Sequence, residues 1–399
     1  MKIRDVDAAF LLCKTALLVF YVSDACTKLL YYLKYDFSRV SLVFRFAYEV
    51  LFFVLILVFL NQIRQTFLKV FFALLALFFV GQILYSLQID YSYNYIENVL
   101  IFNKYFFVFI IYFALYPLQN HAEKLGGLIK VFENILFFNA SAAILGFIFQ
   151  IDLFRTYIDQ PYRYGYSGFI FAQNEATLFF YIGISYFYYQ HFIVGSKTYK
   201  FWFFLLAAIL LGTKGIYLCL GLFLVFHFLS YSSLKSKIIV IIGVIFLFYV
   251  SSWYLQTDSS QKILNYFILQ TQESGLLNML LSGRNLLFET RIPDILSKWS
   301  AINYFIGGQD VSFDTIEMDF FDLFLFFGLV GGITILLLYF FTLFKLNLRK
   351  PFNLFFVFSY FLLAFFAGHF FYSAVNALYL CLICLYFYTS QERIKSESE

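Results

Sequence analysis

Long apolar segments follow one another along almost the whole chain, separated by short polar stretches. A helix needs about 20 apolar residues to cross the hydrocarbon core of a bilayer. The pattern therefore predicts an all-α protein with about twelve membrane-spanning helices. Their predicted ranges are 8–32, 42–60, 67–86, 99–117, 131–150, 168–194, 199–213, 215–234, 238–254, 316–342, 353–371 and 373–390. Only the polar segment 212–215 divides the short span 199–213 from the one that follows it.

The composition agrees with an integral membrane protein and excludes a soluble globular domain. Hydrophobic residues make up 62% and charged residues 13% of the 399 positions, whereas soluble domains are about half apolar and about a quarter charged. The net charge of +4 is spread among the loops, and no basic stripe indicates a nucleic-acid partner. No phosphate-binding Gly-rich motif of nucleotide-binding proteins is present, so the sequence gives no indication of ATP or nucleotide-sugar chemistry.

The distribution of Lys and Arg predicts that both termini are cytoplasmic, because short cytoplasmic loops carry an excess of these residues. With this orientation the cytoplasmic side receives Arg64, Lys69, Lys124, Lys130, Lys197, Lys200, Lys235, Lys237, Lys345, Arg349, Lys350, Arg393 and Lys395. The loop 88–98 on the opposite side contains Asp90 and Glu97 but no Lys or Arg. Lys34 and Arg39 are exceptions, since they would lie outside.

Two outward-facing segments interrupt this single polytopic domain of residues 1–399. The shorter segment covers 151–167, and the longer one covers 255–315, between the ninth and tenth spans. A loop of this length among short loops is typically functional or disordered. Because it contains Trp299 and many Leu and Ile residues, we expect ordered, partly amphipathic helices within it.

The candidate chemistry of the longer segment consists of arginines and of acids that open the next span. Arg284 follows Ser282-Gly283, and Arg291 lies one to two helical turns further on. Glu317, Asp319 and Asp322 come directly at the predicted helix start. Capping of the helix dipole explains acids in a first turn, but Asp322 lies more than a turn deeper. Burial of an ionised carboxylate in a membrane is costly, so at least one of the three acids is a functional candidate.

The shorter segment contains tyrosines around an arginine and leads into a polar helix start. Tyrosines at a membrane surface are normally interfacial residues, yet with an adjacent Arg they also suit sugar stacking and anion binding. The candidates here are Tyr162, Arg163, Tyr164, Tyr166, Asn174, Glu175 and, at the later hinge, Lys214. No group of His and Cys residues has the spacing of a metal site, and no cofactor is predicted.

The order of these features is similar to that of the O-antigen polymerase and O-antigen ligase superfamily of bacterial surface polysaccharide assembly. The resemblance covers residues 160–335, and outside this range it is limited to hydropathy. Its marks are Arg163-x-Gly165-x-x-Gly168-Phe169, Gln173-Asn174-Glu175, Gly212-Thr213-Lys214-Gly215, Ser282-Gly283-Arg284, and an acidic helix start before Gly328 and Gly331. Ligases of the superfamily carry a His-Asn pair where this chain has Glu317-Met318. This departure favours a polymerase over a ligase.

The resemblance implies a repeat-unit polymerase at the outer face of a bacterial cytoplasmic membrane. Its substrate would be an oligosaccharide linked to undecaprenyl diphosphate, and the product an O-antigen or capsule chain. The resemblance and the pattern together assign catalysis to Glu317 or Asp319 and to Arg284. Substrate binding would involve Arg163, Arg291, Lys214, Tyr162, Tyr164, Tyr166, Asn174 and Glu175.

The expected partners are membrane lipid and, in the same pathway, a flippase and a chain-length regulator. A ligase-like transferase and a lipid-linked oligosaccharide flippase are the alternatives. The long loop and the lack of an internal repeat argue against a flippase.

Overall fold

The protein is helical throughout the part that the computed structural model describes. This part comprises residues 3–35, 40–59, 61–89, 92–160, 163–196, 199–230, 234–254 and 275–398, with isolated positions between 254 and 275. It contains 16 α-helices and no strand, and extended backbone pairs only in an isolated bridge between Arg155 and Tyr166. The helices are α1 Ile3–Tyr32, α2 Val40–Val54, α3 Asn61–Ser86, α4 Tyr95–Leu115, α5 Ala122–Phe149, α6 Gln173–Tyr188, α7 Lys200–Leu210, α8 Lys214–Ser230, α9 Leu234–Tyr254, α11 Leu276–Leu281, α12 Arg284–Ser297, α13 Asn303–Ile306, α14 Val311–Asp314, α15 Asp319–Phe341, α16 Pro351–Phe366 and α17 Ala374–Ser398.

Several of these helices identify a multi-pass membrane protein. Six are long and apolar enough to cross a bilayer, namely the helical stretches Asp5–Tyr32, Val40–Val58, Ile63–Ser86, Tyr95–Asn120, Ala122–Phe149 and Asp319–Phe341. Four shorter apolar helices accompany them, namely Lys200–Leu210, Lys214–Ser230, Pro351–Phe366 and Ala374–Ser390. Each of the twelve predicted ranges overlaps one helix, ten of these helices are among the apolar helices named above, and the predicted division between α7 and α8 is present.

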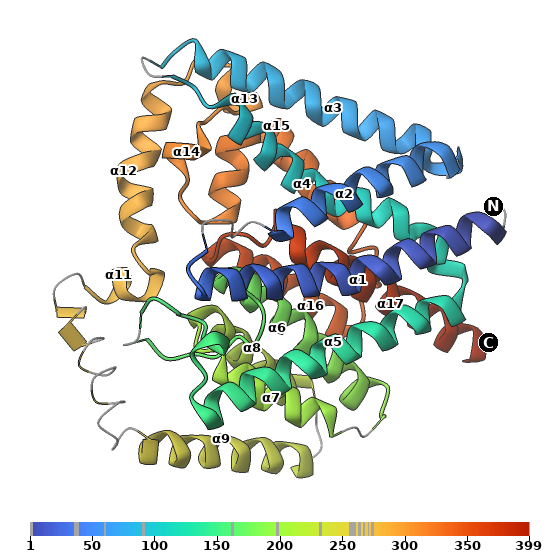
Figure 1. Ribbon diagram of the computed structural model, residues 1–399, viewed down its shortest axis with the longest axis vertical. Coiled ribbons are helices and arrows are strands. Elements are labelled where there is room, and N and C mark those ends of the chain that lie inside the picture. The colour runs from blue at the N-terminus through green and yellow to red at the C-terminus, as the bar shows by residue number, and fades with distance from the viewer. Residues whose placement is uncertain are drawn as a thin grey trace.

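The two ends of the bundle differ in composition and structure. The first turn of α1 and the end of α17 lie on the same side (right in Figure 1). The short helices α11, α12 and α14 lie at the opposite end, where α12 runs across the ends of the bundle helices. The predicted long outer segment therefore contains helices in its described part, and these helices cover the bundle end that is remote from both termini.

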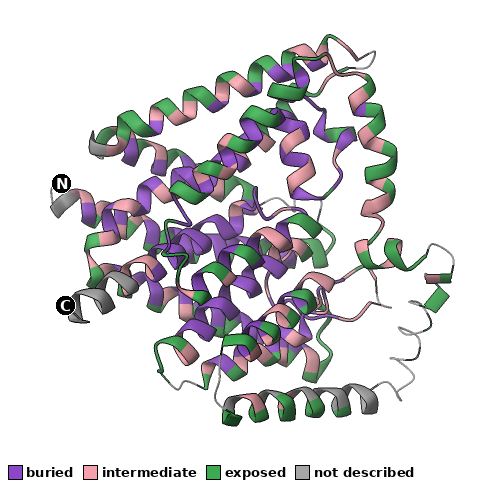
Figure 2. Ribbon diagram, turned by 180° about the vertical axis from the view of Figure 1, so that it is seen from behind, coloured by how far each residue is buried: buried purple, intermediate pink, exposed green. Residues whose placement is uncertain are grey.

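Aromatic side chains fill the centre of the bundle. Buried positions concentrate in the central helices, whereas α3, α9 and α12 carry many exposed ones (Figure 2). Several buried tyrosines donate their hydroxyl groups to backbone carbonyls, since an unpaired polar group is costly away from water. Tyr181 donates to the Phe356 carbonyl at 2.6 Å, and Tyr339 donates to the Phe371 carbonyl at 2.9 Å.

The helix α15 differs from the predicted span 316–342 in two ways. It begins at Asp319, and its backbone is broken at Gly328, where φ is 67° and ψ is −174°. An L-residue rarely adopts this conformation. A Cβ atom at Gly328 would also clash with the backbone of Gly307. The break therefore exists because the loop after α13 packs directly against α15, a tertiary contact that hydropathy does not reveal.

Two non-helical segments lie among the bundle helices, and buried side chains satisfy their backbone. The first is the loop before α6, which the sequence predicted as part of a span from residue 168. Lys28 of α1 donates to Ser167 Oγ at 2.7 Å and to the carbonyls of Gly168 and Ile170 at 2.7 and 3.2 Å. Asn139 of α5 accepts from the Phe169 N–H at 2.8 Å. Irregular backbone inside a membrane requires such internal partners.

The second non-helical segment links α16 to α17. Asp319 accepts hydrogen bonds from the N–H groups of His369, Phe370 and Phe371 at 2.7, 2.5 and 2.9 Å. Tyr360 donates to the Phe370 carbonyl at 3.0 Å. The start of α15 and the start of α17 are thereby fixed to one another.

Candidate functional site

The segment 151–167 packs against the hinge between α7 and α8. Tyr166 donates its N–H to the Leu210 carbonyl at 2.7 Å, and Thr156 donates its hydroxyl to the Leu211 carbonyl at 2.7 Å. Gly165 and Gly212 face each other so closely that a Cβ atom on either would clash with the opposite backbone. The motif around Gly165 and the motif that begins at Gly212 are therefore in direct contact, although they are more than 40 residues apart in the sequence.

The hinge also contacts the turn that precedes α12. Lys214, the first residue of α8, donates to the carbonyl of Met279 and to Ser282 Oγ, the latter at 3.0 Å. Ser282 and Gly283 both have positive φ angles, 57° and 83°, which turn the chain between α11 and α12. Arg284 follows as the first residue of α12.

Arg163, Lys214 and Arg284 form what we call the basic cluster. Lys214 lies within electrostatic range of both arginines. Arg163 stacks on the Tyr157 ring, with its guanidinium carbon 3.7 Å from the ring centroid, and donates to the Tyr157 hydroxyl at 2.9 Å. Burial raises the pKa of Tyr157, and the nearby Arg163 and Arg284 cations oppose this shift. Tyr157 therefore remains neutral and positions Arg163 without neutralising it.

Glu317 forms an ion pair with Arg284 of the basic cluster. Its carboxylate lies 3.7 Å from an Arg284 nitrogen, and the side chains of Glu317 and Arg284 are 52% and 14% exposed. Glu317 has a left-handed backbone conformation, with φ at 62°, and directly precedes the turn into α15. Its backbone packs against Gly368 in the link before α17. Glu317 is thus outside the helix, accessible, and next to the basic cluster.

Asp319 and Asp322 have a different environment from Glu317. Asp319 is 0% exposed and uses both carboxylate oxygens to hold the 369–371 backbone. Asp322 is also buried and accepts from the N–H groups of Ile316 and Met318 at 2.8 and 3.2 Å. The sequence predicts that Asp322 lies more than a turn into the helix, too deep for capping. That interpretation was wrong, because the helix begins at Asp319 and Asp322 lies in its first turn.

The other predicted site residues lie around the basic cluster or away from it. Arg291 donates to the backbone carbonyl of Thr315, so it fastens the segment before α15. Tyr166 is buried, and its hydroxyl donates to Gln150 at 2.9 Å, which favours a packing role. Tyr164 is half-buried beside the Phe147 ring, and Asn174 is half-buried in the first turn of α6. Tyr162 lies outside the described residues.

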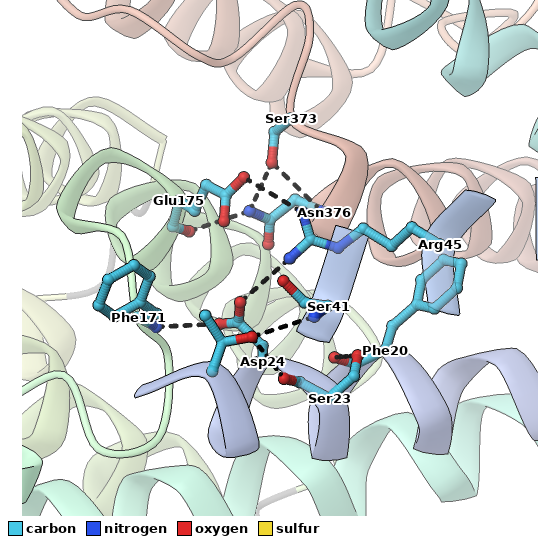
Figure 3. A network of polar contacts seen from close by, with 10 residues as sticks. Phe20, Ser23, Asp24, Ser41, Arg45, Phe171, Glu175, Ser373 and Asn376 are labelled. Carbon is cyan, nitrogen blue, oxygen red and sulfur yellow. Dashed lines mark hydrogen bonds and ion pairs between the residues drawn. The ribbon is translucent and has the colours of Figure 1, made fainter. Parts of the chain in front are cut away.

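A second polar cluster connects α1, α2, α6 and α17 (Figure 3); of its members only Glu175 was predicted as a site residue. Arg45 of α2 donates to Asp24 of α1 at 3.0 Å and lies 4.0 Å from the Glu175 carboxylate at the start of α6. Asp24 also accepts from the Phe171 N–H at 2.9 Å. The available signal was the presence of Asp24, Lys28 and Arg45 inside apolar spans, where ionisable residues mark functional or structural centres.

Electrostatic interactions connect the two clusters. Lys104 of α4 interacts with Glu175 and with His369. Arg284 of the basic cluster also interacts with His369. Charged residues of α4 and of α12 therefore act on both the start of α6 and the link before α17.

The basic cluster has the chemistry of an anion site. Among the described residues, Arg163 and Lys214 hydrogen-bond to neutral groups, and Arg284 pairs with one carboxylate. Three converging cations repel one another, and an anionic ligand relieves this repulsion. Guanidinium groups bind phosphate oxygens in a bidentate manner. The described residues contain no group of three or more His, Cys, Asp and Glu side chains that could hold a metal ion.

Comparison with protein-family models, with curated proteins and with solved structures gives no match.

Proposed function

We propose that this protein is a membrane enzyme that joins polysaccharide repeat units carried on undecaprenyl diphosphate. The observation that carries the proposal is the basic cluster, in which Arg163, Lys214 and Arg284 converge from three separate segments beside the accessible Glu317. In a lipid-linked glycan the diphosphate is a dianion attached to an apolar chain, and it gains a further negative charge as it leaves. A cluster of cations at one end of a membrane helix bundle can bind the negatively charged diphosphate while the apolar chain stays in the bilayer.

In the proposed reaction a hydroxyl group of one lipid-linked unit attacks the anomeric carbon of the growing glycan. A new glycosidic C–O bond forms, and the C–O bond to the diphosphate breaks with its electron pair remaining on the diphosphate. Arg163, Lys214 and Arg284 stabilise the departing charge. The Glu317 carboxylate accepts the proton of the attacking hydroxyl. Arg284 therefore positions Glu317 and also contacts the leaving group.

The proposed location is a bacterial cytoplasmic membrane, with both termini cytoplasmic and the basic cluster at the outer face. The Lys and Arg distribution in the loops supports this orientation. The helices α11 to α14 would cover the site from the outside, and a flippase and a chain-length regulator would be partners in the same pathway.

The test is a reconstitution of purified protein in proteoliposomes with lipid-linked repeat units from the host, in the presence of EDTA. We expect a ladder of lipid-linked products with increasing numbers of repeat units. Replacement of Arg284 by Lys should remove most of the product, because an ammonium group does not reproduce the bidentate contact. Arg349→Lys, in the loop between α15 and α16, is the matched control and should leave the ladder unchanged.

Other outcomes would identify the alternatives. Transfer of a preformed glycan to a different acceptor lipid, without chain growth, would indicate a ligase. Movement of the lipid across the bilayer without a new glycosidic bond would indicate a flippase. A ladder that disappears in EDTA and returns with magnesium would assign part of the charge stabilisation to a metal ion.

A further inference from the structure

The cluster formed by Arg45, Glu175 and Asn376 contains polar atoms without protein partners. Asn376 of α17 is 0% exposed, and its Nδ2 donates to the Glu175 carbonyl at 3.0 Å and to Ser373 Oγ at 2.9 Å. This fixes the orientation of the amide and leaves Oδ1 as a buried acceptor without a donor. Arg45 Nε is a buried donor without an acceptor. Both observations hold within the described part of the chain.

The Glu175 carboxylate is held only loosely in the same cluster. It lies 4.0 Å from an Arg45 nitrogen, which is too long for a hydrogen bond. The side chains of Arg45 and Glu175 are 16% and 17% exposed although they lie inside the bundle (Figure 3). Polar groups at this depth face either protein or a wet cavity. The cluster therefore offers one donor, one amide acceptor and a carboxylate to something other than protein.

We propose that Arg45, Glu175 and Asn376 form a subsite for the hydroxyl groups of a neutral sugar ring. A hydroxyl group both donates and accepts, so neighbouring hydroxyls of one ring can accept from Arg45 Nε and donate to Asn376 Oδ1 and Glu175. An anion is disfavoured here, because an anion requires donors, whereas the groups available at this subsite are one donor, the amide oxygen of Asn376 and the Glu175 carboxylate. The proposal rests on the proposed function, and it identifies the glycan, in addition to the diphosphate, as a recognised part of the substrate.

The position of the subsite agrees with a substrate that carries sugars on a diphosphate. Lys104 links Glu175 electrostatically to His369, and His369 lies within range of Arg284. A diphosphate held by the basic cluster would thus place its attached sugars toward the middle of the bundle. Asp24 positions Arg45 through the 3.0 Å ion pair and is itself held by the Phe171 N–H.

The experiment compares two probes on purified protein in nanodiscs. One probe is undecaprenyl diphosphate without sugar, and the other is the lipid-linked repeat unit isolated from host membranes. Native protein should bind the sugar-bearing probe at least tenfold more tightly. In Asn376→Ala and in Glu175→Gln this preference should largely disappear, while the affinity for undecaprenyl diphosphate stays unchanged. Arg284→Lys should weaken the binding of both probes.

The control variant is Asn353→Ala. Asn353 is a buried residue near the start of α16, and its side-chain amide donates to the Asn347 carbonyl at 2.8 Å. It should retain the full preference for the sugar-bearing probe. If native protein binds both probes equally, the subsite holds water only and the inference is overturned, whereas diphosphate binding and the proposed function survive. If native protein binds neither probe, the proposed function fails as well. The comparison on native protein requires no variant to fold.

Discussion

At the scale of single residues, environment separates three carboxylates that look alike in the sequence. Asp319 and Asp322 direct their oxygens to backbone N–H groups and are buried. Glu317 is 52% exposed and lies 3.7 Å from Arg284. A carboxylate that accepts several backbone hydrogen bonds stabilises the local backbone conformation. An accessible carboxylate beside a cation can instead exchange a proton with a substrate.

We expect Glu317→Gln to abolish detectable chain growth while the amount of folded protein stays near normal. An amide of the same size cannot accept the hydroxyl proton, and general-base catalysis contributes about 10²–10⁴-fold. Asp319→Asn should instead reduce the amount of folded protein, because an amide offers one oxygen where the backbone of 369–371 requires two. Product ladders and monodisperse yield after purification measure the two effects.

Contrary results would reassign the base. Full-length product from Glu317→Gln, together with well-folded but inactive Asp319→Asn, would make Asp319 the base. Normal chain growth in both variants would show that no side-chain base is needed. Catalysis would then rest on stabilisation of the leaving group by the basic cluster.

At the scale of elements, hydropathy predicts where helices lie but not where they break. The predicted apolar segments overlap helices, as expected where a backbone must satisfy its own hydrogen bonds in apolar surroundings. The break at Gly328, the late start of α6 at Gln173 and the start of α15 at Asp319 were not predicted. Each results from contacts with distant residues, such as Gly307 against Gly328 or Lys28 against Gly168. Local periodicity contains no information on such contacts.

The break in α15 leads to a prediction on stability. Gly328→Ala should destabilise the protein, since a residue held in such a conformation costs about 1–3 kcal/mol and the added methyl group meets the Gly307 backbone. Thermal unfolding in detergent should show a lower midpoint. Gly221→Ala in α8 is the control, because no atom lies within 4 Å of a Cβ there. A midpoint equal to that of the control would mean that α15 is straight in the membrane.

At the scale of the whole molecule, four of the predicted site residues gather at one end of the bundle. Arg163, Lys214, Arg284 and Glu317 were selected from separate stretches of sequence, and the structure places them together. In the second polar cluster Glu175 was predicted, but Asp24 and Arg45 were not, because each is a single charge within an apolar span. Their pairing depends on how α1, α2 and α6 pack, which hydropathy does not specify. A buried charge in a span is nevertheless a signal that sequence alone provides.

The orientation of the bundle decides on which side of the membrane this chemistry takes place. Two exposed serines serve as probes in a variant that lacks the five native cysteines. Ser297 ends α12, the helix that begins at Arg284, and Ser196 follows α6 on the opposite predicted side of the membrane. In intact cells Ser297→Cys should react with a membrane-impermeant maleimide, whereas Ser196→Cys should react only after the membrane is permeabilised. The reason is the excess of Lys and Arg in the loops on the side of Ser196.

Labelling of Ser196→Cys with protection of Ser297→Cys would place the basic cluster in the cytoplasm, where lipid-linked units are made and not joined. This result would overturn both the orientation and the proposed reaction. Labelling of both positions in intact cells would show that the reagent had crossed the membrane, which a cytoplasmic marker protein carrying one exposed cysteine detects independently.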